Sequence, residues 1–156
     1  MSAAKPRKDD DRQRLGHLLW EVSARTSLLA EAALAPTALA PSSSGVLDTI
    51  SEAPGTTIAE MARAWPTSAQ NISQTVARLE RLGFLERRLP DRGRGVALFI
   101  TEAGERARAD ANARKSALDD ELAQALGAEN YAQLVALLKH ARTVVTALDT
   151  ERRSTR

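Results

Sequence analysis

Amide and hydroxyl side chains are concentrated in residues 67–78, a segment whose apolar residues recur at helical spacing. Glutamine and asparagine can form paired hydrogen bonds with the edge of adenine, and serine and threonine can bond phosphate oxygens near a helix N-terminus. The candidate contacts are Thr67 and Ser68 for phosphate, Gln70, Asn71, Ser73 and Gln74 for bases, and Arg78 as a further positive charge. Polar residues on an exposed helix face are more often simply solvated, so this pattern needs support from its surroundings.

Two arginines stand at a glycine-flanked turn shortly after this segment. Phe84–Leu89 and Val96–Ile100 have strand composition and the residues between them have turn composition, which predicts a β-hairpin with Arg92 and Arg94 at its tip. An arginine at such a tip can enter a narrow minor groove of DNA. The helix and the hairpin occur in the order of a winged helix-turn-helix, and together they favour a surface that binds double-stranded DNA.

The distribution of charge agrees with this interpretation. The formal net charge of the 156 residues is only +2, so any nucleic-acid surface must be local. Residues 57–100 contain seven arginines and four acidic residues, an excess of three positive charges. The positive excess is therefore concentrated where phosphate binding would require it.

The composition argues against several other kinds of site. The chain contains no cysteine, which excludes disulfides, thiolate nucleophiles, Cys-ligated zinc and thiol-based sensing. His17 and His140 are too few for a histidine metal site, and no Gly-rich phosphate loop, nucleophile elbow or His-Glu-x-x-His motif is present. We therefore expect no catalytic residues, no metal and no cofactor. We also expect a cytoplasmic protein without a membrane partner, because no stretch resembles a signal peptide or a membrane span.

The predicted elements are mostly helical. The chain contains 29 alanines and only 3% aromatic residues, a composition that favours helices over strands. Thr57 and Glu60 form a capping-box pattern, and Gly83 is placed to end a helix. The predicted helices run from about Asp11 to Leu34, after the potential caps Ser42, Ser43 and Ser44, from Thr57 to Pro66, from Ser68 to about Leu82, from Thr101 to Leu126, and from Gly127 to about Asp149. The expected fold is mainly α with a small β-hairpin wing.

Several stretches resemble the MarR family of bacterial transcriptional regulators. Residues 73–88 are similar to the family's recognition helix running into the wing, and Thr101-Glu-Ala-Gly104 matches the opening of the helix after the wing. Thr57–Ala62 and Leu15–Leu19 are similar to other helices of the family. The resemblance covers roughly residues 12–148 and implies a winged helix-turn-helix regulator of transcription, most simply a repressor.

The wing departs from the family pattern by about one residue. The family usually carries an Asp-x-Arg arrangement there, and this chain has Asp91-Arg92-Gly93-Arg94. Counted back from Thr101, Arg94 falls on the family's wing arginine, so the resemblance supports a minor-groove role for Arg94 more than for Arg92. Moving the gap by one residue would instead pair Asp91 with Arg94, and the other interpretation of Asp91 is that it only closes the turn.

The resemblance also implies a homodimer held by long N- and C-terminal helices. The expected organisation is a flexible tail (1–10), an N-terminal dimerisation helix (11–40), the winged domain (41–101), C-terminal dimerisation helices (102–149) and a flexible tail (150–156). Apolar stripes in the two helical regions suit such an interface, although they could also pack within one chain. A two-fold dimer would place its recognition helices about 34–36 Å apart on a pseudo-palindromic operator.

Similar proteins bind small, often aromatic or anionic effectors between the dimer helices and the winged domain. By this analogy the candidate effector residues are His17, Trp20, Arg25 and Ser44. A tryptophan such as Trp20 is more often part of a core or dimer interface, and His17 is more often an ordinary surface or interface residue than a sensor. A winged-helix module that binds another protein and lacks specific DNA binding remains the alternative function.

Overall fold

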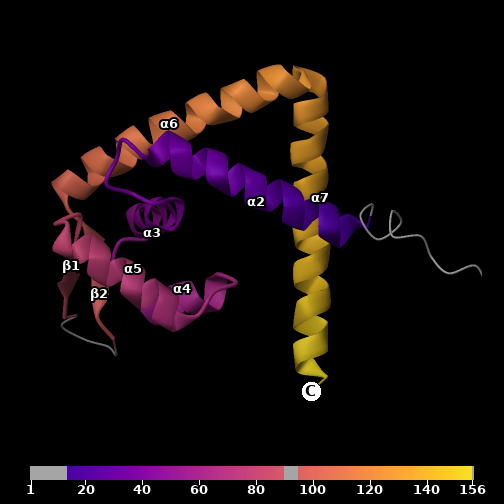
Figure 1. The fold of residues 1–156 in the computed structure, drawn as a ribbon. Coiled ribbons are helices and arrows are strands. Elements are labelled where there is room, and N and C mark those ends of the chain that lie inside the picture. Colours follow the sequence, from indigo (N-terminus) through magenta and orange to yellow (C-terminus); the bar gives the residue numbers. More distant parts are fainter. Residues whose placement is uncertain (1–13, 90–94, 156) are drawn as a thin grey trace, which may run out of the picture. The chain divides into compact units, whose positions relative to one another are not determined.

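The computed structural model describes residues 14–89 and 95–155 (Figure 1). The chain divides into two compact units, Met1–Lys115 and Ser116–Arg156, with the division inside one long helix. The described elements are α2 (Leu15–Leu34), α3 (Pro41–Glu52), α4 (Ile58–Ala64), α5 (Ala69–Arg81), β1 (Leu85–Arg88), β2 (Ala97–Ile100), α6 (Glu102–Leu126) and α7 (Ala128–Ser154). This element order is that of a winged helix-turn-helix, which confirms the expected fold class.

The core of the first unit lies where α3, α4 and α5 meet the hairpin. α5 packs against α3 and α4, and β2 packs against α3. The apolar residues of α5 at positions 72, 76 and 79 are buried, as the helical spacing predicts. Leu82, which continues the same helical spacing, is instead 40% exposed because it lies just beyond the end of the helix. The buried side chains that form the core are Leu34, Leu39, Val46, Leu47, Ile50, Met61, Ile72, Val76, Leu79, Leu85, Leu98 and Ala111.

Local sequence signals fix the ends of α4 and α5. The Thr57 hydroxyl accepts a hydrogen bond from the Glu60 amide at 3.2 Å, and the Thr57 amide donates to the Glu60 carboxylate at 2.8 Å, completing the predicted capping box. This amide hydrogen bond holds the pKa of Glu60 below its usual range. The Ser68 hydroxyl caps α5 by accepting from the Asn71 amide at 3.2 Å. Gly83 then follows α5 with a φ of 72°, a conformation that glycine adopts without steric penalty.

The start of α3 differs from the expectation. The three serines were predicted to precede the helix as caps, but Pro41 occupies its first turn and Ala40 is the N-cap, without a side-chain hydrogen bond. Proline suits the first position because the amide it lacks has no partner inside the helix. Ser42, Ser43 and Ser44 therefore lie inside the helix, and Ser43 and Ser44 are buried.

The wing is anchored to the rest of the unit by backbone contacts. β1 and β2 pair antiparallel, with Leu85 opposite Ile100 and Arg88 opposite Ala97. Leu98 also exchanges backbone hydrogen bonds with the connection between α3 and α4, at residues Gly55 and Thr56. The predicted hairpin is thus confirmed, and its tip, residues 90–94, lies outside the described residues.

The opening of α6 explains two positions of the Thr-Glu-Ala-Gly sequence. The Thr101 hydroxyl accepts from the Gly104 amide at 3.0 Å and donates to the Gly83 carbonyl at 2.6 Å, so one side chain caps α6 and ties it to the end of α5. A Cβ on Gly104 would lie 1.9 Å from the Phe84 carbonyl oxygen. Only glycine therefore fits where α6 crosses the start of β1.

The second unit consists of the end of α6 and all of α7. Gly127 separates the helices, with a φ of 82°, as predicted. α7 continues past the expected end at Asp149 to Ser154, so the residues predicted to form a loose tail are mostly helical. Alanine and leucine have high helix propensity, and their frequency along α7 favours continuation of the helix into its polar C-terminal residues. Within the described residues, no helix is long and apolar enough to cross a membrane.

Candidate nucleic-acid interface

The predicted recognition residues lie together at the N-terminal half of α5 and in the turn before it. Ser68 is the N-cap, Thr67 precedes it, and Gln70, Asn71 and Gln74 are exposed on the helix. Ser73 is only half-exposed. Arg78 is exposed one turn after Gln74. The first turns of α5 therefore present amides and hydroxyls to solvent, as a helix that contacts base edges must.

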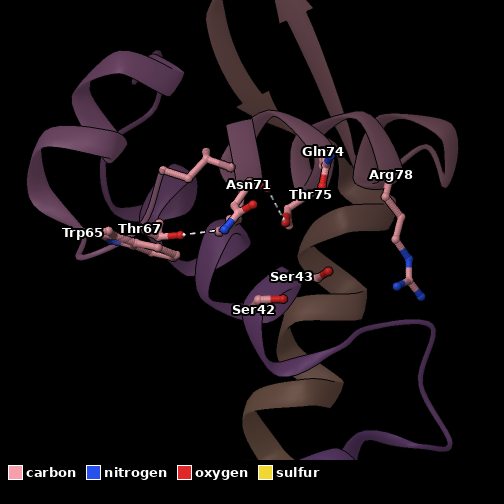
Figure 2. Close-up of a pocket in the computed structure, with 10 residues that line it drawn as sticks. Ser42, Ser43, Trp65, Thr67, Asn71, Gln74, Thr75 and Arg78 are labelled. Carbon is pink, nitrogen blue, oxygen red and sulfur yellow. Dashed lines mark hydrogen bonds between the residues drawn. The ribbon is translucent and has the colours of Figure 1, made fainter. Parts of the chain in front are cut away.

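A shallow groove of about 480 Å³ runs beside this helix (Figure 2). α3 forms one wall of the groove and α5 the other, and the Trp65 ring lies at one end. Arg78 is the one charged residue in the lining, which contains no carboxylate among the described residues. The lining residues are Ser42, Ser43, Val46, Trp65, Thr67, Asn71, Ile72, Gln74, Thr75 and Arg78. A groove whose one charged lining residue is an arginine is suited to binding an anion.

Hydrogen bonds on the α5 side hold some of these polar atoms in place. The Asn71 side-chain amide donates to the Thr67 hydroxyl at 3.4 Å, and the Thr75 hydroxyl donates to the Asn71 carbonyl at 3.0 Å (Figure 2). Arg78 reaches the Ala38 carbonyl in the α2–α3 connection at 3.5 Å, a long and weak contact. The Arg78 guanidinium can therefore leave this carbonyl for a charged partner at little cost.

Sequence reasoning missed the contribution of α3 to this groove. Ser42 and Ser43 were considered only as caps, and Trp65 and Thr75 were not assigned to any site. A signal was present for the serines, because Pro41 strongly favours the first turn of a helix and so places the following residues inside it. The pairing of α3 with α5 across a groove depends on tertiary packing and has no local signal.

The base of the wing carries arginines that are already engaged. Arg87 forms an ion pair with Glu80 of α5 at 3.0 Å. The Arg88 guanidinium stacks over the Phe99 ring at 4.5 Å and pairs with Glu86. The Arg87–Glu80 pair links β1 to α5, whereas both contacts of Arg88 lie within the hairpin. Arg92 and Arg94, the predicted minor-groove residues, lie outside the described residues.

An ionic network joins α3 to α6 behind the groove. Asp48 accepts hydrogen bonds from Lys115 at 2.8 Å and from Asn112 at 3.0 Å, and Arg108 lies 3.6 Å away. Burial alone would raise the pKa of Asp48, but the hydrogen bonds and charges of Lys115, Asn112 and Arg108 outweigh it and lower the pKa. The network holds α3, one wall of the groove, in a fixed position on α6.

Three of the four candidate effector residues share a surface on α2. His17, Trp20 and Arg25 line a shallow depression, with the His17 and Trp20 rings 5.8 Å apart. Arg25 is paired with Glu21 on the same helix at 3.1 Å. Ser44 lies elsewhere: it is fully buried in α3, and its hydroxyl has no hydrogen-bond partner in the part of the chain that the structure describes. The structure therefore brings together the first three candidates but not the fourth.

The comparisons with known proteins agree with the fold. The sequence model of the MarR family matches residues 39–95, which include α3, α4, α5 and β1. The transcriptional repressor CouR, solved on a 23-mer DNA duplex, has 24% identity and a TM-score of 0.80 over 89% of this chain and 99% of its own. No curated protein sequence matches the chain.

Two further solved structures are slightly closer in sequence. A MarR-family regulator from a Rhodococcus species has 29% identity and a TM-score of 0.75, covering 86% of this chain and 94% of its own. A MarR-family protein of Mycobacterium tuberculosis, solved with salicylic acid, has 27% identity and a TM-score of 0.70, covering 85% of this chain and 98% of its own. The same M. tuberculosis protein has also been solved with DNA. With its winged helix-turn-helix, its recognition-type α5 and these matches, the chain is similar to the MarR family of transcriptional regulators, whose sequence model matches its winged part.

Proposed function

We propose that the protein is a sequence-specific repressor that binds a pseudo-palindromic operator as a homodimer and is modulated by a small aromatic or anionic ligand. The observation that carries DNA binding is the exposed amide face of α5, Gln70, Asn71 and Gln74, beside a groove with no carboxylate in its described lining. Its N-terminal turn is held by the Ser68 cap, so the amides are presented from a rigid element. The complexes of CouR and of the M. tuberculosis protein with DNA support the same assignment.

Selection of bound duplexes from a random library tests the proposal directly. We expect the selected duplexes to contain a pseudo-palindrome with half-sites about one helical turn apart. The double variant Gln74→Ala with Arg94→Ala should lose operator binding, because it removes a proposed base contact and the proposed wing contact. A control with Gln124→Ala and Arg106→Ala, two exposed residues of α6, should bind as the wild type does. Unchanged affinity in the first variant would instead favour a protein-binding module.

The salt dependence of binding provides an independent test. If about six phosphates are neutralised, the affinity should fall roughly 10³-fold between about 50 and 200 mM salt. Fluorescence polarisation of a labelled duplex at several salt concentrations measures this slope. Binding that is insensitive to salt would contradict a phosphate-contacting surface.

The effector part of the proposal rests on the surface of α2 that carries His17, Trp20 and Arg25. The salicylic acid complex of the M. tuberculosis relative supports an aromatic anion as the ligand class. A ligand changes DNA affinity only by binding one dimer conformation better than the other. In a Trp65→Phe variant, Trp20 is the one remaining tryptophan, and added salicylate should quench its fluorescence and release the duplex over the same concentration range. Quenching of Trp20 without release of the duplex would show that salicylate binds at this surface but does not regulate DNA binding.

A further inference from the structure

We propose that the groove between α3 and α5 is a binding site for one phosphate of the DNA backbone, formed by the first turn of α3 and by Arg78. This inference rests on the proposed DNA binding and adds a second contact element, α3, to the recognition helix. Its residues on the α3 side are Ser42 and Ser43, which face α5 across the groove (Figure 2).

The first observation is the uncapped start of α3. The N-cap, Ala40, offers no side-chain hydrogen bond, and the first amide bonded back along the chain is that of Ser44, which donates to the Ala40 carbonyl at 3.0 Å. The amides of Ser42 and Ser43 therefore have no partner within residues 14–89 and 95–155. Free amides at the positive end of a helix dipole bind phosphate well.

The second observation is the Ser43 side chain. Ser43 is only 2% exposed, yet its hydroxyl makes no hydrogen bond to any described residue, and it lines the groove. A nearly buried hydroxyl usually has a partner, because leaving one without costs free energy. Ser42 presents a second hydroxyl one residue earlier, and Figure 2 shows both on the groove side of α3. The two hydroxyls lie beside a groove whose described lining contains no carboxylate to accept from them.

The third observation is the charge across the groove. Arg78 projects from α5 toward the start of α3 and is held only by the weak contact with the Ala38 carbonyl (Figure 2). A phosphate between the helices would accept from the serines on one side and from the guanidinium on the other. Because Asn71 and Gln74 line the same groove, this phosphate would fix the register of the proposed base contacts.

The test compares variants on a selected duplex and on a scrambled duplex of the same length. A phosphate contact contributes equally to both, so Ser42→Ala with Ser43→Ala should weaken both complexes about tenfold while leaving their affinity ratio unchanged. Arg78→Gln should also weaken both and should lower the salt slope by about one. Gln74→Ala, a proposed base contact, should instead reduce the ratio.

Matched controls separate this site from general effects. Ser116→Ala and Arg106→Gln make the same changes on α6 outside the groove and should leave both affinities nearly as in the wild type. Replacing single phosphates of the selected duplex by neutral methylphosphonates should identify one position per half-site at which the serine variant no longer differs from the wild type. Inorganic phosphate, added in place of chloride at constant ionic strength, should not displace the duplex.

The outcomes distinguish this inference from the proposed function. If the wild type binds the selected duplex and the serine variant binds equally well, the phosphate site is wrong and DNA binding stands. If the serine variant loses affinity only for the selected duplex, the groove reads bases and the phosphate assignment is wrong. Displacement by inorganic phosphate would show a site for free anions instead. Failure of the wild type to bind any duplex would overturn both proposals. Circular dichroism melting of each variant checks that it is folded.

Discussion

The winged part of the first unit, from α3 to β2, and the long helix α7 differ sharply in where their apolar side chains lie. In the winged part, Leu47, Val76, Leu79 and Leu98 are completely buried. In α7 no described residue is buried, and Leu137 is 66% exposed. α2 resembles α7 in this respect, with Trp20 at 67% exposure and Leu34 as its one buried residue. The winged part therefore buries its apolar side chains in the core of the first unit, whereas α7 and most of α2 leave theirs exposed.

This difference in burial suggests that the winged part and the long helices have different roles. A rigid winged core keeps the amide face of α5 and the groove in a fixed geometry. Exposed apolar stripes of this extent are unusual on a monomer and typical of an interface, which supports the proposed homodimer.

Leu47→Ala should have the largest effect. Leu47 is fully buried, so its truncation should lower the free energy of unfolding by about 2–5 kcal/mol. Chemical denaturation measures the change. The control is Leu89→Ala, where the leucine is 83% exposed and the expected change is within about 0.5 kcal/mol. Equal effects at the two positions would show that the winged part lacks the buried core described here.

Leu137→Glu should act on assembly rather than on folding of the winged part. A charge in the proposed interface should weaken dimerisation by about 10- to 100-fold, since one buried leucine contributes about 1.5–3 kcal/mol. Sedimentation velocity over a range of concentrations measures this change. Lys139→Glu, on the same helix, introduces the same side chain at a polar position and should leave the dimer intact. If the wild type sediments as a monomer, the proposal that α7 forms a dimer interface is wrong.

Gly104→Ala should destabilise the winged part by about 1–3 kcal/mol, because the added methyl group meets a backbone carbonyl that cannot move freely. Gly16→Ala is the matched control, since a Cβ there meets nothing within 4 Å and alanine favours helix. The control should be neutral or slightly stabilising. Thermal unfolding followed by circular dichroism distinguishes the two; a stable Gly104→Ala protein would mean that α6 can shift away from β1.

Acid should weaken the attachment of α6 to α3 by a smaller amount. The pKa of Asp48 is lowered in the folded protein, so its contribution is fully present above the usual carboxyl range, about pH 4, and is lost as the pH falls through the lower folded value. We expect Asp48→Asn to reduce stability at neutral pH by about 1 kcal/mol or less and to flatten this acid dependence. Chemical denaturation at pH 7 and below pH 4 measures the loss of stability and its dependence on pH. Asp110→Asn, which affects an exposed pair with Arg114, is the control; an identical pH profile in both variants would contradict a special role for Asp48.

Much of the fold could be predicted from local patterns. The capping box at Thr57, the Ser68 cap and the terminator Gly83 act within one helical turn, so their outcome depends on neighbouring residues alone. The hairpin strands were also predicted, because β-branched and aromatic residues are concentrated there. The start of α3 was missed because three serines suggested caps, whereas Pro41 has the stronger positional preference.

Local patterns in the sequence are therefore enough to predict which segments are helix or strand, which face of α5 is polar, and where positive charge is concentrated. Three features appear only in the folded chain: Ser42 and Ser43 lie opposite Arg78, Asp48 of α3 meets Lys115 of α6, and Gly104 has no room for a side chain. The two kinds of feature differ in the sequence separation of the residues that interact. Caps and periodicity involve residues within about one turn, whereas a groove, an ionic network or a close backbone approach depends on where distant segments pack.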